Sequence, residues 1–319
     1  MHSIHYDTII LGGGPAGLTA GIYLSRARIK TLILNEGTIG GQLVLTHEIA
    51  NYPGVEHISG YQLSSIMRKQ GKEFGCDIKA NLTINSVDFS AEPKQVHLSD
   101  GRIFTSDSII IATGGRSRTL GVSGETELKG KGISYCATCD GDFFTDKEII
   151  VVGGGNSALE EAVSLTKYAS KVTIVHQFDH FQAFEHAIKE AQNHPKIDFI
   201  MESTIAEFFG EEKLQAVDIK HIPSGTIERR LIDGVFVFIG YIPNTEWLTD
   251  EIALNTRSEI IVNSDLQTSV EGVFAAGDSI AKKYRQVTTA VSDGTIAALA
   301  ASEYLHNKKT AELSELVSI

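Results

Sequence analysis

The sequence predicts an α/β protein of two doubly wound, three-layer domains, with the second domain inserted into the first. Short apolar runs alternate with glycine clusters and helix-like stretches, a pattern typical of parallel βαβ units. This pattern begins twice, at residues 12–17 and again at residues 153–158. A further short apolar run at residues 272–278 ends in a carboxylate near the C-terminus. The first domain is therefore expected to resume after the second.

The composition fits two apolar cores and excludes several classes of protein. Of the 319 residues, 42% are hydrophobic. The net charge of −12 argues against a nucleic-acid partner, because affinity for duplexes comes mainly from Lys and Arg. The longest apolar stretches, residues 109–112 and 235–239, are far shorter than the roughly 20 residues that span a bilayer, so no membrane segment is expected. Residues 1–7 lack the features of a secretory signal, which favours a cytoplasmic location.

Glycine-rich and polar stretches mark the expected domain boundaries. One is the stretch 113–117, and the other is the Pro-Asn turn at 243–244. We expect a discontinuous first domain of residues 1–115 and 246–319, and an inserted domain of residues 116–245. The tail from residue 307 to residue 319 is expected to be a frayed helix end.

The first glycine motif predicts a site for an adenine dinucleotide. Gly12, Gly14 and Gly17 follow a strand predicted at residues 6–11 and precede a predicted helix. The first glycine allows a tight turn, the second lets the backbone approach a pyrophosphate, and the third lets helix pack on strand. Glu36 follows the next predicted strand, about 20 residues past the motif, where an acid hydrogen-bonds ribose hydroxyls.

The second glycine motif has the same form but lacks the residue that recognises a ribose. Gly153, Gly155 and Ala158 again lie between a predicted strand and a predicted helix, which favours a second dinucleotide. The position that corresponds to Glu36 is occupied by the neutral Gln177, and residues 176–182 contain no Arg or Lys for a 2′-phosphate. Asp179 is either a ribose ligand or a solvated surface acid.

Cys136 and Cys139 are the candidate reactive pair of this chain. Two intervening residues let the thiols close a small disulfide ring, and a thiolate of lowered pKa is the usual nucleophile for exchange. Zinc is the rival, but it normally needs four ligands and the chain has no second pair, so no metal is expected. Asp140 beside the pair is either a proton shuttle or a turn residue. The third cysteine, Cys76, is expected to be a small core residue.

The order of these motifs resembles that of the low-molecular-weight thioredoxin reductases. The resemblance extends over nearly the whole chain and rests on both glycine motifs, on Cys-Ala-Thr-Cys-Asp-Gly at 136–141 and on Gly-Val-Phe-Ala-Ala-Gly-Asp at 272–278. Three further segments are similar to parts of the family that contact the flavin, at residues 40–43, at 48–54 (which begins with Glu48), and at 284–286 with Ala290.

The resemblance implies two Rossmann-like domains, bound FAD and a homodimer. Cys139 would face the flavin, Cys136 would attack a disulfide on thioredoxin or a similar protein, and Asp140 would be the acid–base residue. The inserted domain would rotate so that the pair alternates between flavin and partner. The residues expected to hold FAD are Gly12, Gly14, Pro15, Ala16, Gly17, Glu36, Gly41, Gln42, Asn51, Gly277, Asp278, Arg285, Gln286 and Val287, and those of the second loop are Gly153, Gly155, Asn156 and Ser157.

One departure from the family leaves the electron donor open. The family's NADPH site carries a His-Arg-Arg segment and a further Arg four residues later, and here Gln177, Phe178 and Gln182 occupy the three arginine positions. Loss of these cations weakens binding of the 2′-phosphate of NADPH. The donor is therefore NADPH, NADH, or a carrier such as ferredoxin or a deazaflavin. Two other hypotheses remain, a flavin-dependent dithiol oxidase that uses oxygen and a non-catalytic redox-sensing flavoprotein.

Overall fold

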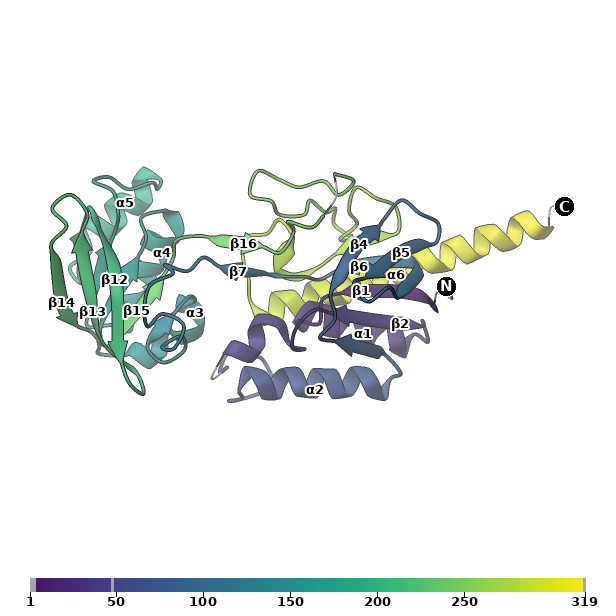
Figure 1. Cartoon of the computed structure of the whole chain (residues 1–319), viewed down its shortest axis with the longest axis horizontal. Helices are drawn as coiled ribbons and strands as arrows, with labels where there is room; N and C mark the ends of the chain where they lie inside the picture. Colours follow the sequence, from purple (N-terminus) through teal and green to yellow (C-terminus); the bar gives the residue numbers. More distant parts are fainter. Residues whose placement is uncertain (1–3, 47–48, 249, 318–319) are drawn as a thin grey trace. The chain divides into compact units, whose positions relative to one another are not determined.

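The structure is a computed structural model, in which residues 4–46, 49–248 and 250–317 are described. The chain divides into two compact units (Figure 1). One consists of Met1–Arg116 with Ile242–Ile319, and the other of Ser117–Tyr241, so the predicted insertion of one domain into the other is confirmed. The chain crosses between the units at two short strands, β7 (Gly115–Ser117) and β16 (Tyr241–Pro243), which pair with each other.

A seven-stranded sheet forms the centre of the first unit. Its strand order is β3-β2-β1-β6-β5-β4, and β17 also pairs with β6. The pairs among β1, β2, β3, β6 and β17 are parallel, whereas β4, β5 and β6 form an antiparallel meander. The strands are β1 (Ile4–Leu11), β2 (Thr31–Asn35), β3 (Asp77–Ala80), β4 (Ile84–Asp88), β5 (Lys94–Leu98), β6 (Ile103–Ile111) and β17 (Val273–Ala275).

Local sequence explains where the helices of this unit begin. Helix α1 (Pro15–Arg26) starts with a proline, whose fixed φ suits the first helical position. Helix α2 (Gly60–Glu73) begins with a capping box between Ser59 and Gln62. The third helix, α6 (Val287–Val317), continues as one helix to Val317, and fraying of its end from residue 307 stays a prediction. Two 3-10 turns, η1 (Gly41–Leu45) and η3 (Gly277–Ser279), complete the unit.

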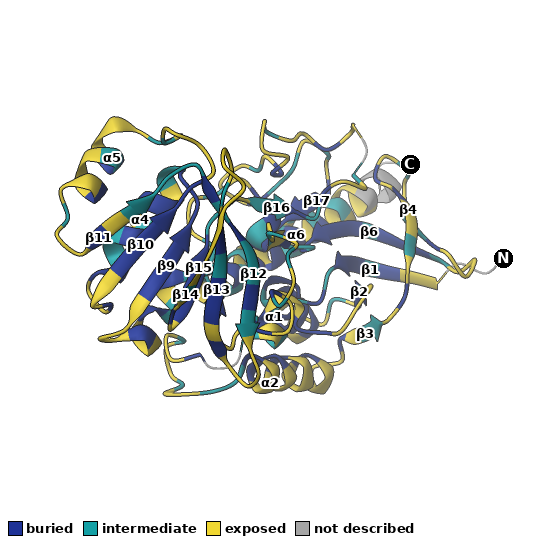
Figure 2. Cartoon of the chain, turned by 60° about the vertical axis from the view of Figure 1, so that its left-hand side comes forward, coloured by how far each residue is buried: buried dark blue, intermediate teal, exposed yellow. Residues whose placement is uncertain are grey.

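The second unit has a five-stranded parallel sheet between two different layers. Alternate residues of its central strand β9 enter different cores: Ile149 and Val151 pack with the helices, and Ile150 and Val152 pack with an antiparallel sheet. The predicted three-layer α/β arrangement is confirmed, and its third layer is a small sheet of β12, β13 and β14. Figure 2 shows the central strands of this unit as buried.

The elements of the second unit follow the chain in this order. The parallel sheet has the order β11-β10-β9-β15-β8. Its elements are β8 (Ile133–Ser134), α3 (Ala137–Asp140), η2 (Gly141–Phe144), β9 (Glu148–Val152), α4 (Asn156–Leu165), β10 (Lys171–Val175), α5 (Glu185–Gln192), β11 (Ile197–Ile200), β12 (Ser203–Gly210), β13 (Leu214–His221), β14 (Ile227–Leu231) and β15 (Gly234–Val237). Among the described residues of both units, no helix is long and apolar enough to cross a membrane.

Candidate active site

The turn between β1 and α1 requires glycine at two positions for steric reasons. A Cβ on Gly12, whose φ is +110°, would lie 2.2 Å from the carbonyl oxygen of Ala112. A Cβ on Gly17 would lie 2.0 Å from the carbonyl oxygen of Gly12, so helix and strand approach closely only without a side chain. By contrast, a Cβ on Gly14 would meet no described atom within 4 Å. The backbone of Gly14, at the N-cap of α1, is therefore open to a ligand.

Segments far apart in the sequence meet at the N-terminus of α1. A Cβ on Gly41 would lie 3.3 Å from the Cα of Gly14, and one on Gly277 would lie 2.9 Å from the Cβ of Ala16. The structure thus brings together three of the segments that the sequence analysis assigned to FAD. Because the free amides of a helix N-terminus favour anions, this junction suits a pyrophosphate.

The expected ribose acid lies at the carboxyl end of β2. Glu36 is exposed directly after the strand, and one of its carboxylate oxygens accepts a hydrogen bond of 3.0 Å from the amide of Ile84. Its neighbour Asn35, which the sequence analysis did not single out, accepts a hydrogen bond of 2.8 Å from the amide of Gly13. Asn35 therefore fixes the glycine turn against the end of β2.

Two other residues expected near the flavin lie at the surface, and a third lies outside the described residues. Gln42 in η1 and Asn51 are exposed. Glu48, the first residue of the segment that resembles a flavin contact, lies outside the described residues.

A lysine bridges two carboxylates in the C-terminal segment of the first unit, near the N-terminus of α1. Asp278 in η3 has a buried Oδ1 that, among the described residues, accepts no hydrogen bond, although Nζ of Lys282 lies 3.3 Å away. Lys282 also donates a 2.6 Å hydrogen bond to Asp293, whose carboxylate accepts the amide of Gly277 at 3.1 Å. Burial raises the pKa of Asp278, and the charge of Lys282 opposes that rise. The sequence analysis predicted Asp278 but missed Lys282 and Asp293.

The predicted Arg285, Gln286 and Val287 lead into α6. Arg285 forms an ion pair with the buried carboxylate of Glu259. The amide of Gln286 donates a hydrogen bond of 3.0 Å to the hydroxyl of Thr289, and Val287 is the first residue of the helix. These contacts fix the backbone of this segment at the start of α6.

The two candidate cysteines of the second unit form a disulfide. Cys136 and Cys139 flank the first turn of α3, with their Cα atoms 5.3 Å apart. Cys136 is the N-cap residue, and its Sγ accepts a hydrogen bond of 3.2 Å from the amide of Cys139. A donor aimed at this sulfur favours its thiolate form after the disulfide is opened. The remaining cysteine, Cys76, is buried in the core of the first unit as expected.

A partly buried carboxylate lies at the end of the same short helix. Asp140 shares a 2.5 Å hydrogen bond with the hydroxyl of Ser134, and that hydroxyl accepts the amide of Cys136 at 3.1 Å. Burial raises the pKa of Asp140, and the nearby charge of Asp142 raises it further. A carboxyl group with a raised pKa is suited to give and take protons near neutral pH. Ser134 was missed because a single serine in a short strand carries no sequence signal.

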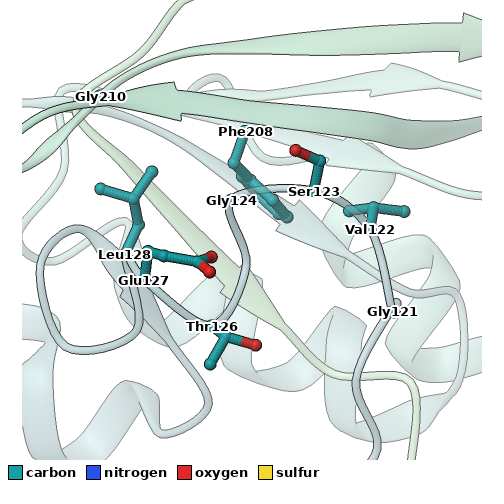
Figure 3. Close-up of a pocket in the computed structure, with 9 residues that line it drawn as sticks. All are labelled: Gly121, Val122, Ser123, Gly124, Thr126, Glu127, Leu128, Phe208 and Gly210. Carbon is teal, nitrogen blue, oxygen red and sulfur yellow. The ribbon is translucent and has the colours of Figure 1, made fainter.

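A second buried carboxylate positions the residue before the disulfide. Glu125 accepts a 2.7 Å hydrogen bond from the hydroxyl of Tyr135, and it also accepts the amides of Leu120 and Gly121. The loop that Glu125 holds also lines a surface pocket, together with Phe208 and Gly210 (Figure 3). None of the residues expected to be catalytic or to bind a cofactor lines this pocket, which we therefore treat as separate from the site.

The second glycine loop is compact but open at its tip. A Cβ on Gly154 would lie 2.4 Å from the ring of His176, so this ring covers the loop from one side. Gly155 is the N-cap of α4, and the nearest described atom to a Cβ there would be 3.8 Å away. Ser157 is exposed, and the side chain of Asn156 accepts the amide of Phe184 at 2.7 Å. The N-terminus of α4 can therefore still receive an anion.

The segment 176–182, which follows β10, contains no Arg or Lys for a 2′-phosphate. Gln177 and Phe178 are exposed there, and Asp179 forms an exposed ion pair of 2.6 Å with His180. The backbone amide of Gln182 donates a hydrogen bond of 2.8 Å to the carbonyl oxygen of Gly154, which places Gln182 next to the glycine loop. Gln182, one of the three positions where the family carries arginine, thus lies beside the glycine loop, and all three positions are uncharged.

Comparison with known families identifies this combination of sites. A family model described as pyridine nucleotide-disulphide oxidoreductase matches residues 6–294, a range that includes both glycine loops and the disulfide. The chain belongs to the pyridine nucleotide-disulphide oxidoreductase family. As a member of this family and of its thioredoxin reductase type, it is an FAD-dependent disulfide oxidoreductase.

Relatives within this family match nearly the whole chain. A thioredoxin reductase of Peptoclostridium acidaminophilum is 43% identical over 94% of this chain and 97% of the relative. A 34.2 kDa protein in a rubredoxin operon of Clostridium pasteurianum is 42% identical over 95% of this chain and 98% of the relative. The crystal structure of thioredoxin reductase from Streptococcus pyogenes MGAS5005 is 38% identical, covers 96% of this chain and 100% of its own, and has a TM-score of 0.92.

Proposed function

We propose that this oxidoreductase transfers electrons from a donor to FAD, from FAD to the Cys136–Cys139 disulfide, and from Cys136 to a disulfide on thioredoxin or a similar protein. The observation that carries the proposal is the disulfide at the N-terminus of α3 beside a partly buried acid, in a chain with a glycine turn open to a dinucleotide. The names of the relatives favour thioredoxin as the partner. By the same resemblance we propose a homodimer in the cytoplasm.

The first unit has the groups that FAD needs. The open backbone at Gly14 and the amides at the start of α1 suit its pyrophosphate, and Glu36 at the end of β2 suits a ribose. The buried Oδ1 of Asp278, which accepts no hydrogen bond from the described residues, is an acceptor for a hydroxyl group of the ligand. When bound, FAD supplies a carrier that takes up two electrons and passes them to a disulfide.

Exchange with the partner needs two thiols and one acid. After reduction of the pair, the thiolate of Cys136 attacks one sulfur of the partner, so that a mixed disulfide forms and the partner's own S–S bond breaks. The leaving thiolate takes a proton from Asp140. Cys139 then gives up its own proton and attacks the sulfur of Cys136, which restores the enzyme disulfide. The partner's second sulfur takes that proton, so the partner is released with two thiols. The partner gains two electrons and two protons, and the enzyme pair loses two electrons.

Trapping experiments test the roles of the two cysteines. The Cys139→Ser holoenzyme is mixed with a thioredoxin that lacks its resolving cysteine and whose other cysteine is activated as a mixed disulfide with an aryl thiol. Cys136 should displace the aryl thiol and form a stable mixed disulfide with thioredoxin, because no thiol remains to release thioredoxin. The matched Cys136→Ser variant should form much less of this adduct. Equal adducts from both variants, measured by mass spectrometry, would contradict the assigned order of attack.

The electron donor is the second part of the proposal. The open N-terminus of α4 favours a nucleotide, whereas the uncharged Gln177, Phe178 and Gln182 disfavour NADPH. We therefore propose NADH or an external carrier such as ferredoxin or a deazaflavin ahead of NADPH.

Anaerobic absorbance of the purified flavoprotein separates these donors. NADPH, NADH and dithionite are added to separate samples while the flavin band is followed. Rapid bleaching by NADH alone supports a dinucleotide in the second loop, and bleaching by dithionite alone supports an external carrier. Bleaching by NADPH at micromolar concentration would show that the missing arginines are not needed.

A further inference from the structure

The hydroxyl of Ser134 lies between the backbone of Cys136 and the carboxylate of Asp140. It accepts the amide of Cys136 at 3.1 Å, lies 2.5 Å from Oδ2 of Asp140, and lies 3.3 Å from the carbonyl oxygen of Cys136. Ser134 is only 5% exposed and belongs to β8, which pairs with β15 in the parallel sheet. A buried, strand-fixed side chain thus connects the candidate acid to the nucleophilic cysteine.

A hydroxyl group has one proton to donate and two lone pairs that accept. The amide of Cys136 uses one lone pair. When Asp140 is ionised, Ser134 donates its proton to Oδ2, and the short distance fits a charge-assisted hydrogen bond. When Asp140 is protonated, it donates to Ser134 instead, and the serine proton turns to the carbonyl oxygen of Cys136. Both states are satisfied with the heavy atoms in the same positions.

We propose that Ser134 is a positioning residue that holds Asp140 beside the disulfide and exchanges donor and acceptor roles with it as the acid loses and regains its proton. The inference rests on the proposed function, in which Asp140 protonates the leaving thiolate of the partner. A backbone amide in the place of Ser134 could only donate, and it would keep Asp140 ionised.

The charges around Asp140 agree with repeated proton uptake. Asp142 in η2 acts on it electrostatically, and α4, which packs against α3, carries the acids Glu160 and Glu161. On the sheet side, Ser134 is paired with the apolar Phe236 of β15. Negative charge and burial favour the protonated acid, and Ser134 stabilises the ionised form after the proton has left.

Two electron acceptors distinguish proton delivery from general damage to the disulfide loop. The holoenzyme is reduced anaerobically with stoichiometric dithionite and mixed with oxidised thioredoxin or with the aryl disulfide DTNB, over a range of pH. The leaving thiol of DTNB has a low pKa and needs no proton, whereas an alkyl thiolate does. Wild type, Ser134→Ala, Ser134→Thr and Asp140→Asn are compared, with flavin absorbance and circular dichroism as checks on folding.

Ser134→Ala should slow thioredoxin reduction roughly tenfold, as expected for loss of one hydrogen bond to a charged group, and leave the DTNB rate within about twofold. The rate with thioredoxin falls as Asp140 ionises. Without the hydroxyl this fall should shift to higher pH, because the hydrogen bond from Ser134 stabilises the ionised form. Ser134→Thr should restore both the rate and the pH profile, and Ser134→Ala should add nothing to Asp140→Asn.

Several results would overturn the inference. One is equal slowing with both acceptors, and another is an unchanged pH profile in a folded Ser134→Ala enzyme. If that variant does not fold, a folded Ser134→Thr enzyme with the profile of Asp140→Asn would count against the inference in the same way. A reduced wild-type enzyme that transfers nothing to either acceptor would instead refute the proposed function, and the role of Ser134 would fall with it.

Discussion

Lys282 is the cation nearest to the acid that we assign to the flavin. It bridges Asp278 and Asp293, and its side chain is only 13% exposed. Asp293 in turn holds the amide of Gly277, so this one lysine connects the η3 turn to α6. Without Lys282, two carboxylates would repel each other in a partly buried site.

Replacing Lys282 should therefore weaken FAD binding. For Lys282→Met we expect roughly 10- to 100-fold weaker binding, since breaking a partly buried charge interaction costs about 1.5–3 kcal/mol. Lys282→Arg should retain most of the affinity. Titration of the apoprotein with FAD, followed by flavin fluorescence, measures this, and the exposed neighbour Lys283 provides a matched control as Lys283→Met. Equal losses for both methionine variants would contradict the assigned role.

The partly buried Asp140 should make the stability of the protein depend on pH. Its pKa in the folded state lies above the ordinary value of about 3.9. Its contribution to stability is thus complete below that value and is lost as the pH rises through the raised pKa. Asp140→Asn, which stays neutral, should gain stability relative to wild type between pH 4 and pH 8. Thermal unfolding at both pH values checks this, and a difference that is constant with pH would contradict it.

The glycine turns after buried strands were predicted from the sequence, because simple steric rules determine them. Glycines at 12, 17 and 153 are required by close backbone contacts, and two of them, Gly12 and Gly153, directly follow a buried strand with an apolar signal. The antiparallel sheet of β12, β13 and β14 had no such signal. The ion pairs from Lys308 in α6 to Glu92 and Asp107 had no signal either, because only the fold brings these residues together.

The residues of the site divide in the same way, into those that a motif predicts and those that only the fold brings in. Cys136, Cys139 and Asp140 are neighbours in the sequence and were predicted together. Ser134 acts on Asp140, and Glu125 acts on the neighbouring Tyr135, through hydrogen bonds that depend on where β8 and the loop before it lie. Residues of this kind follow from tertiary structure and not from a motif.

Two substitutions in the second glycine loop test which of its glycines is closely packed and which has open space. Gly154→Ala would place its Cβ 2.4 Å from the ring of His176, which is stacked on Phe181 and hydrogen-bonded to the carbonyl oxygen of His180. This overpacking should destabilise the protein by about 1–3 kcal/mol. Gly155→Ala, which has space, should cost less than about 1 kcal/mol. Denaturant unfolding of the two variants measures the difference, and equal costs would show that the ring moves aside.

The end of β10 should determine which dinucleotide is accepted. Substituting arginine for Gln177, Phe178 and Gln182 supplies cations beside the glycine loop, and each charged hydrogen bond to a phosphate is worth about 1.5–3 kcal/mol. The triple variant should favour NADPH over NADH by at least roughly tenfold relative to wild type. Flavin reduction at varied dinucleotide concentration gives this ratio. An unchanged ratio would indicate that the second loop does not bind a dinucleotide.

At the scale of the whole molecule, the account requires electrons to pass from the first unit to the second. The glycine turn and Asp278 belong to the unit of Met1–Arg116 with Ile242–Ile319, and the disulfide belongs to Ser117–Tyr241. Each unit therefore has one half of the chemistry, and neither half alone reduces a protein disulfide. A dithiol oxidase would instead pass electrons from a dithiol substrate to the flavin and from the flavin to oxygen.

The most direct test is anaerobic mixing of the dithionite-reduced enzyme with oxidised thioredoxin, while flavin absorbance and new thiols on thioredoxin are measured together. The account predicts that the flavin is reoxidised as two thiols appear on thioredoxin for each pair of electrons. Cys136→Ser should abolish both signals, whereas Cys139→Ser should abolish flavin reoxidation and release no thioredoxin with two thiols. A flavin that stays reduced with thioredoxin but is rapidly reoxidised by oxygen would contradict the account and favour the dithiol oxidase.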